Sequence, residues 1–270
     1  MHEIKRYPVQ NALLRNYIRF FWELRIEQAS LDHVLVPQKN INLRINLADT
    51  DHYLHQGTDE HKLEKIYFSG LHDHFTNAHL KLEGKVSILG VCFYPDGFYP
   101  FINVPLSEFR NKVAGADEAG LELSHTIREQ LNEAATKEQM LEILEKELLR
   151  LLVQNNASPE KIRQIINAVR VSGNLQMNQF CARNNIGLRK LERMFNKYVG
   201  VSASTYNTLN RFHGSMNLLL KGDYKRLSDV AYDNGYFDQM HFIKEFRRFA
   251  GNTPGSFISR NNSILQIGKF

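Results

Sequence analysis

Apolar and polar residues alternate through the first hundred positions, and this pattern predicts β-strands. The alternation is strict over 41–47, as in a strand that buries one face and exposes the other. Runs rich in β-branched and aromatic residues predict further strands over 18–26, 31–36, 65–69 and 86–93. Glycines and prolines separate the runs, among them the Pro95-Asp96-Gly97 cluster. Several short strands joined by turns predict a small barrel or sandwich.

The period of the pattern changes near residue 116. Apolar residues recur at helical spacing over 121–131 and 140–152, with acidic residues between them. The second segment carries an apolar stripe, formed by Met140, Leu141, Leu144, Leu148, Leu151 and Leu152. We expect this stripe to form a dimer interface, with packing against the β-rich region as the alternative.

A polar break over 155–158 leads into a second helical region. Ser158 and Pro159 have the order of an N-cap and a first helical residue. Helical spacing then continues to about residue 258. We therefore expect an α+β protein of two domains. A β-rich domain covers 1–115, a helical connector 116–155, an all-α domain 156–260 and a tail 261–270.

The all-α region contains a weak internal repeat. An offset of 50 aligns Phe180-Cys181 with Val230-Ala231. An offset of 51 aligns Leu191, Phe195, Gly200 and Tyr206 with Phe242, Phe246, Gly251 and Phe257. Each unit has a short helix, a tight turn and a longer helix that a glycine ends. In the second unit, Gly235 marks the turn and Asp238 can cap the next helix. The repeat predicts two helix-turn-helix units.

A helix predicted from Ala203 to about Lys221 joins the two units. Some 18 residues at 1.5 Å each span roughly 27 Å. Successive major-groove faces of DNA lie about 34 Å apart. The predicted helix could therefore hold two reading helices near the spacing of the groove. The alternative is a bundle of six or seven helices without a role in DNA binding.

The charge distribution divides the chain at the same place. Residues 1–155 hold 17 Lys and Arg against 22 Asp and Glu, whereas residues 156–270 hold 17 against 7. An acidic half joined to a basic half indicates that the basic half contacts a polyanion.

Length, cysteine content and hydropathy further limit the class of protein to which the chain can belong. A chain of 270 residues can form two domains with a core each. Two separate cysteines, Cys92 and Cys181, make a disulfide scaffold untenable. The first ten residues lack the apolar core of a signal peptide, and no run approaches the roughly 18 apolar residues of a membrane span. We expect a cytoplasmic protein with no membrane association.

The run from Gly235 to Arg248, followed by Gly251, Pro254 and Phe257, resembles the signature of the AraC/XylS transcriptional regulators. The segment 191–195 resembles the matching part of the first unit, so the resemblance covers residues 158–258. Residues 1–110 resemble, less specifically, a β-rich domain of some members through Phe20-Phe21-Trp22, Val36-Pro37 and the segment 90–95. Such domains are usually taken as sensing or dimerising modules.

Two glycines depart from the family pattern. Gly187 stands where a serine or another cap is common, which suggests weaker anchoring of the first reading helix. Gly214 lies inside the linker helix, where glycine costs roughly 1 kcal/mol relative to alanine. We expect this second glycine to soften the linker.

The resemblance implies that the exposed face of each second helix reaches base edges. By position, the base-reading residues are Arg189, Glu192, Arg193 and Asn196 in the first unit, and Gln239, Met240, Ile243 and Lys244 in the second. Arginine suits guanine, glutamine adenine and glutamate cytosine, while Met240 and Ile243 could press on thymine methyls. Lys197, Arg247 and Arg248 are expected on phosphates. For each polar side chain, a solvated helix face is the alternative.

The implied function is sequence-specific regulation of transcription, without enzyme activity or a cofactor. The expected partners are double-stranded DNA, RNA polymerase, a second copy in a homodimer and a small-molecule effector in the N-terminal domain. Five aromatic residues could line the effector pocket: Phe20, Trp22, Tyr67, Phe93 and Phe98. A solid aromatic core is the alternative. The acidic helices over 121–152 would transmit the change to the basic half.

The rival hypothesis is a metal-dependent, cupin-like enzyme with an accessory DNA-binding module. Its best ligand set is His72, His74, His79 and Glu83, but Glu83 follows His74 by nine positions, unlike the pattern of metal-binding cupins. Cys92 lies in an apolar strand without the Pro-Cys-His context of a nucleophile in related repair proteins, and such buried thiols are usually inert. We therefore expect no metal site.

Overall fold

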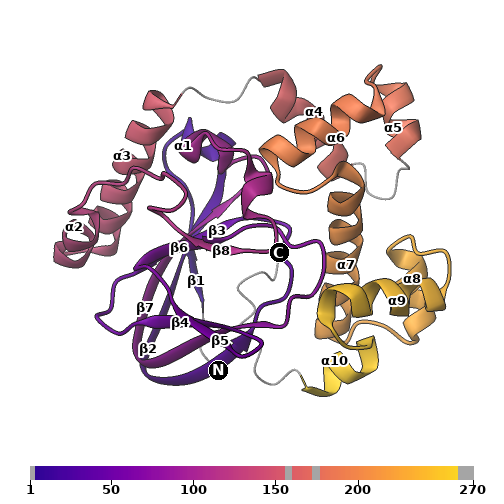
Figure 1. The fold of residues 1–270 in the computed structure, drawn as a ribbon, viewed down its shortest axis with the longest axis horizontal. Helices are drawn as coiled ribbons and strands as arrows, with labels where there is room; N and C mark the ends of the chain where they lie inside the picture. The colour runs from indigo at the N-terminus through magenta and orange to yellow at the C-terminus, as the bar shows by residue number, and fades with distance from the viewer. Residues whose placement is uncertain (1–3, 156–159, 172–176, 261–270) are drawn as a thin grey trace.

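The computed structural model describes residues 4–155, 160–171 and 177–260 of the 270-residue chain. A curled antiparallel sheet dominates the N-terminal part, and helices alone form the C-terminal part (Figure 1). The helices α2 (Ile127–Glu133) and α3 (Lys137–Gln154) lie on the side of the sheet opposite the C-terminal domain (Figure 1). The expected cap at Ser158 and Pro159 and the expected tail over 261–270 lie outside the described residues.

The sheet is built around two long strands that pair along most of their length. In chain order the strands are β1 (Lys5–Tyr7), β2 (Ile18–Val34), β3 (Asn42–Asn46), β4 (His52–Gln56), β5 (Asp59–Lys62), β6 (Ile66–Ser69), β7 (Ala78–Phe93) and β8 (Val113–Gly115). The main path is β1-β2-β7-β3-β6-β8. β4 pairs with the first half of β7 and with β5, while β3 pairs with the second half of β7.

The β-rich N-terminal domain is confirmed, but its sheet does not close. Within the part of the chain that the structure describes, the path begins at β1 and ends at β8, and these two strands do not pair. One apolar cluster lies on each face of the curl. The first contains Leu43, Phe68 and Phe93 and continues into the C-terminal domain. The second contains Trp22, Tyr67 and Cys92.

Both long strands, β2 and β7, extend beyond their predictions, and β7 begins at Ala78 although the sequence predicted a strand only over 86–93. The runs expected as separate strands over 18–26 and 31–36 are one strand, β2, with an irregularity between Ile26 and Ala29. Opposite Ala29 lies Gly84, which has a φ of 74°, and β7 continues through it. The pairing of β2 with β7 continues on both sides of this glycine.

The strand β3 differs from its prediction in burial. Strict alternation predicted one exposed face, yet all five residues of β3 are buried. Its polar side chains, Asn42, Arg44 and Asn46, lie on the inner side of the curl. Gly90 allows this arrangement, because the Trp22 indole occupies the place that a side chain at position 90 would need. The indole N–H donates a hydrogen bond of 3.2 Å to Asn42 Oδ1.

The apolar stripe of α3 packs within the chain. Met140, Leu144, Leu148, Leu151 and Leu152 are buried, and Leu141 is half-buried. They contact the core shared with η1 (Leu14–Asn16) and α1 (Tyr99–Ile102). The stripe is therefore not an exposed dimer face, and the alternative of packing against the β-rich region holds. The other predicted helix is shorter than expected, since α2 begins only at Ile127.

The C-terminal domain consists of helices throughout its described residues. These are α4 (Glu160–Val171), α5 (Met177–Arg183), α6 (Leu188–Tyr198), α7 (Ala203–Lys221), α8 (Leu227–Asp233), α9 (Gln239–Ala250) and α10 (Pro254–Arg260). α7 has the bounds that the sequence predicts: Ser202 caps its start and Gly222, with a φ of 70°, ends it. Figure 1 shows α5 and α6 at one end of α7, with α8 and α9 at the other.

Candidate nucleic-acid interface

Two helix-turn-helix units are present, as the repeat predicts. α5 and α6 form the first, and α8 and α9 form the second. The turns contain Asn185 with a φ of 48° and Gly235 with a φ of 70°. Gly200 and Gly251, which follow the two reading helices, also have positive φ values. The matching apolar residues are buried in both units: Leu191, Phe195, Tyr206, Phe242, Phe246 and Phe257.

The two reading helices start differently. In α9 the Asp238 carboxylate accepts a hydrogen bond of 2.7 Å from the His241 amide, so the predicted cap is present. In α6 the N-cap position is Gly187, which offers no side-chain acceptor. A side-chain cap stabilises a helix by about 1 kcal/mol. The first reading helix therefore depends more on tertiary packing for its stability.

The second unit presents a partly apolar reading surface. Gln239, Met240 and Lys244 are exposed on α9, whereas Ile243 is half-buried and packs against the core. Met240 has 72% of its surface exposed, and the adjacent turn residue Phe237 has 84%. The sequence analysis did not identify Phe237. Its place at the tip of a turn, where few core residues lie within reach, was the signal for its exposure. Such an apolar tip can contact thymine methyls.

The first unit has only two unengaged base-reading candidates. Arg189 and Arg193 are exposed on α6. Glu192 instead accepts a hydrogen bond from the Ala203 amide at 2.8 Å, and so binds the start of α7. Asn196 accepts one at 2.6 Å from Arg110 of the N-terminal domain. The expected reading of bases by Glu192 and Asn196 would therefore require these contacts to break.

The three residues expected to contact phosphates differ in their surroundings. Lys197 lies between domains, with its ammonium 5.5 Å from the ring centre of Tyr99 and 5.3 Å from that of Tyr198. Arg247 and Arg248 are exposed near the end of α9. All three side chains are therefore accessible to a phosphate, and Lys197 differs only in lying next to Tyr99 of the N-terminal domain.

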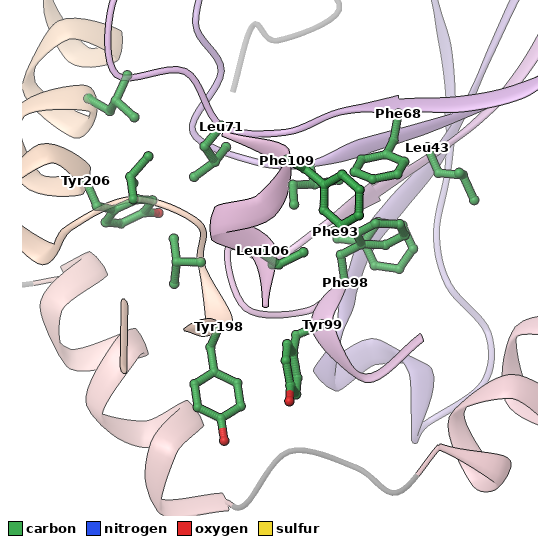
Figure 2. Packing of buried hydrophobic residues seen from close by; sticks show 14 of the residues in the cluster. Leu43, Phe68, Leu71, Phe93, Phe98, Tyr99, Leu106, Phe109, Tyr198 and Tyr206 are labelled. Atoms are coloured by element: carbon green, nitrogen blue, oxygen red, sulfur yellow. The ribbon is translucent and has the colours of Figure 1, made fainter. Parts of the chain in front are cut away.

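The N-terminal domain contacts the two units at equivalent places. Next to the first unit, the Leu106 carbonyl lies close to Gly200, and Arg110 Nε donates to Gly200 O at 3.0 Å. Next to the second unit, the Phe75 amide donates to Arg248 O at 2.8 Å, and its ring packs on Gly251. Each contact satisfies carbonyl groups that a helix end leaves without a partner. Figure 2 shows Tyr99 and Leu106 beside Tyr198 in the apolar part of this seam.

The linker helix contacts the same domain and packs closely within its own. His213 Nε2 lies 2.9 Å from the carbonyl oxygen of Pro37 in the N-terminal domain. The ring is buried, and burial lowers the pKa of His213 to about 3. A side chain at Gly214 would come within 2.2 Å of Asn234 Oδ1. Gly214 therefore permits close contact with the turn of the second unit. This contact replaces our expectation that it softens the linker.

The five aromatic residues proposed for an effector pocket do not meet. Trp22 and Tyr67 lie in the core inside the curl, with Phe20 partly buried beside it. Phe93 and Phe98 lie in the core on the other face, where their ring centres are 5.0 Å apart (Figure 2). In both places the rings fill apolar core.

The histidines of the rival metal hypothesis have separate partners. His72 contacts Ser69, His74 contacts Asp73, and His79 contacts Asp32. Across residues 4–155, 160–171 and 177–260, no three His, Cys, Asp or Glu side chains form a group that could hold a metal ion. Cys92 is buried, and burial raises the pKa of its thiol to about 12, which disfavours the reactive thiolate.

Similarity to known families covers both parts of the chain. Residues 180–260 match a family described as a helix-turn-helix domain. Residues 9–115 match a domain of unknown function (DUF6597). No described helix has the length and apolar character needed to cross a membrane.

Curated relatives match the C-terminal part alone. The HTH-type transcriptional activator RhaR of Yersinia pseudotuberculosis and that of Yersinia pestis are each 34% identical over 85 residues, which is 31% of this chain. The match spans only 29% of the length of these relatives.

Similarity in fold extends over both domains. The solved structure of ToxT from Vibrio cholerae superposes with a TM-score of 0.50 and 10% identity, covering 88% of this chain and 97% of ToxT. The shared architecture thus joins a β-rich N-terminal part to a helical C-terminal part. With its paired helix-turn-helix units and its similarity to RhaR, the C-terminal part of the chain is similar to the DNA-binding domain of the AraC/XylS transcriptional regulators.

Proposed function

We propose that this chain regulates transcription by reading two successive major-groove segments of DNA with α6 and α9. The observation that carries this proposal is the placement of the two reading helices at opposite ends of one helix, α7. At 1.5 Å per residue its 19 residues span roughly 28 Å. This length is comparable with the ~34 Å between neighbouring major-groove faces.

The accessible side chains divide between base and phosphate contacts. Arg189 and Arg193 read bases from the first unit, and Gln239, Met240 and Lys244 do so from the second. Ile243 supports this surface from a half-buried position. Arg247 and Arg248 bind phosphates and so add affinity without sequence information. Lys197 joins the phosphate contacts from its exposed position beside Tyr99. Asn196 reaches DNA only after the seam opens and Arg110 withdraws, and Glu192 only after it releases the Ala203 amide at the start of α7.

Selection from a random DNA library tests the proposal. The full chain is expected to enrich duplexes with two short motifs whose centres lie about 10 base pairs apart. A chain carrying Arg189→Ala and Arg193→Ala should lose the motif of the first unit and keep that of the second. Enrichment of no motif would overturn sequence-specific reading.

Control by a small molecule and contact with RNA polymerase extend this proposal. The matched relatives are named as transcriptional activators, and an activator acts on the polymerase. The docking of the N-terminal domain on both units, through Arg110 and Phe75, offers a direct route for an effector to change DNA binding. It is shorter than the route that we expected through α2 and α3, which pack on the opposite side of the sheet (Figure 1).

A homodimer also remains part of the proposal. Since the α3 stripe is buried, the contact between two copies would use another surface. We place this activity in the cytoplasm, together with DNA and the polymerase.

A further inference from the structure

A cavity of about 250 Å³ lies where the first helix of the C-terminal domain meets the sheet domain. One wall comes from residues 15–16 and 94–96, and the other from α4. A single water molecule needs about 10–15 Å³ of such volume, so the cavity has room for several. This volume suits a small metabolite.

The lining of the cavity includes a buried acidic side chain without a basic partner in ion-pair contact. Asp96 lies in the turn that follows β7 and is only 8% exposed. Among the described residues, no lysine, arginine or histidine approaches its carboxylate within ion-pair distance of 4 Å. The turn is held by the Gly97 amide, which donates to Tyr94 O at 2.9 Å. Buried carboxylates are normally paired, because an isolated buried charge is costly.

Three arginines surround the same cavity and are held in place by other groups. Arg15 donates to the carbonyls of Val9 and Gln10. Arg163 donates to Asn16 O at 3.1 Å, and so reaches across the seam; it also forms an ion pair of 3.0 Å with Glu160, an exposed acid in the lining of the cavity. Arg170 donates to Asn167 and lies 5.4 Å from the ring centre of Tyr94. Arginine presents five donors in a planar fork, so donors beyond these contacts remain for a carboxylate.

The sequence places two of these arginines, Arg163 and Arg170, on one face of α4. Arg163, Asn167 and Arg170 are spaced four and three residues apart, so they project toward the same side of the helix. Ile166 and Val169 anchor the helix in the core beside them. The cavity thus combines one buried acid, Asp96, with three arginines, of which Arg163 is paired with Glu160 and Arg15 and Arg170 have no acidic partner among the described residues.

We propose that this cavity binds a small dipolar carboxylate, an amino acid or a hydroxy acid, and that this compound is the effector. The arginines bind the carboxylate of the ligand, and Asp96 accepts hydrogen bonds from its ammonium or hydroxyl group. Because the ligand touches both domains, its binding changes how firmly the reading units are docked. The assignment of the effector role rests on the proposed function, whereas binding itself does not.

Calorimetric titration of the full chain tests the proposal without DNA. The probes are the common amino acids and small α-hydroxy acids, with acetate and methylamine as compounds that carry only one of the two groups. We expect saturable binding of at least one amino or hydroxy acid, at least tenfold tighter than acetate or methylamine. The comparison of amino acids with hydroxy acids shows which donor faces Asp96.

Substitutions locate the binding. Asp96→Asn and Arg170→Gln should each weaken binding at least tenfold. Lys161→Gln on α4 is the matched control, because Lys161 is exposed on the same helix and does not line the cavity. Circular dichroism and a thermal melt of each variant show that it is folded. If Arg170→Gln does not fold, Asp96→Asn alone decides the question.

Two results would overturn the inference: no binding of any amino or hydroxy acid, or equal binding by Asp96→Asn and the unsubstituted chain. Selection on random DNA separates this outcome from the proposed function. A chain that binds the ligand but enriches no DNA motif would retain the site and lose the regulatory role. A chain that enriches a DNA motif but binds no probe would retain the regulatory role and lose the proposed ligand site.

Discussion

Arg193 is the side chain whose replacement best distinguishes base reading from phosphate binding. It is exposed on α6, next to Glu192, which is bound to α7, and Met194, which is buried. We expect Arg193→Ala to cost about 1–3 kcal/mol of binding free energy on the selected duplex and to relax the preference at one base pair. Fluorescence anisotropy on duplexes that differ at single positions measures both effects. Equal loss on selected and random DNA would show a phosphate contact instead.

Asp96 makes a second prediction, because its burial links stability to pH. Burial raises its pKa from the ordinary 3.8 to about 6. The folded chain therefore holds this proton more tightly than the unfolded chain. The resulting stabilisation is fully present below pH 3.8 and is lost as pH rises to about 6. A difference of about two pKa units corresponds to roughly 3 kcal/mol at pH 7.

Asp96→Asn should remove this penalty. We expect its free energy of unfolding at pH 7 to exceed that of the unsubstituted chain by up to about 3 kcal/mol, with little difference near pH 4. Urea titrations at both pH values measure the change. A less stable variant at pH 7 would mean that the charged carboxylate is stabilised in the folded chain. A side chain that lowers stability where it stands is typical of binding sites.

At the scale of elements, the glycines that end the reading helices also allow the domains to meet. Gly200 has a φ of 97°, and a side chain there would come within 2.8 Å of the Leu106 carbonyl. Gly222 ends α7 with a φ of 70° but has open space around it. Alanine at either position pays for positive φ, about 1–2 kcal/mol. Only alanine at Gly200 must also displace the backbone of the other domain.

We therefore expect Gly200→Ala to lower the free energy of unfolding more than Gly222→Ala does. The difference reports the close contact between the domains, and hydrogen exchange should rise in η2 (Leu106–Phe109) for Gly200→Ala alone. Equal destabilisation by the two substitutions would show that the seam adapts at no cost.

The helices and strands also show which parts of the fold the sequence predicts. Helical period and capping residues predicted α7, and the repeat predicted both helix-turn-helix units, because these signals are local. The fusion of two predicted strands into β2 depends on its partner β7, which pairs with β2 on both sides of the irregularity between Ile26 and Ala29, and the pattern of β2 alone does not contain this pairing. Alternation in β3 identified a strand, but the curl that buries its polar face is formed by distant strands.

The predicted DNA-contacting residues show the same difference between local and long-range determinants. Arg189, Arg193, Gln239 and Met240 project from helix faces that the period alone defines, and they are exposed as expected. Asn196 shares those faces, yet its partner Arg110 lies 86 positions earlier in the chain. Periodicity shows which residues share a face but gives no information about what another domain places against it.

At the scale of the whole molecule, one apolar core runs from the sheet through the seam into both helix-turn-helix units. Arg110 and Phe75 add hydrogen bonds at the ends of α6 and α9. Domains that share a core and capped helix ends should unfold together, unlike domains joined only by a flexible linker. We expect a single cooperative transition, with the same midpoint by tryptophan fluorescence and by circular dichroism. Trp22 reports the sheet, and helical signal reports mainly the C-terminal domain.

Breaking the seam should separate the two transitions. Arg110→Ala leaves Gly200 O and Asn196 Oδ1 without their donor, and Phe75→Ala removes the ring from Gly251. In the doubly substituted chain we expect the fluorescence and circular dichroism midpoints to differ, because each domain then unfolds on its own. Arg150→Ala on α3, far from the seam, is the control and should keep them together. Coincident midpoints in the double variant would show that the apolar core alone couples the domains, and that Arg110 and Phe75 orient the reading units without determining their cooperativity.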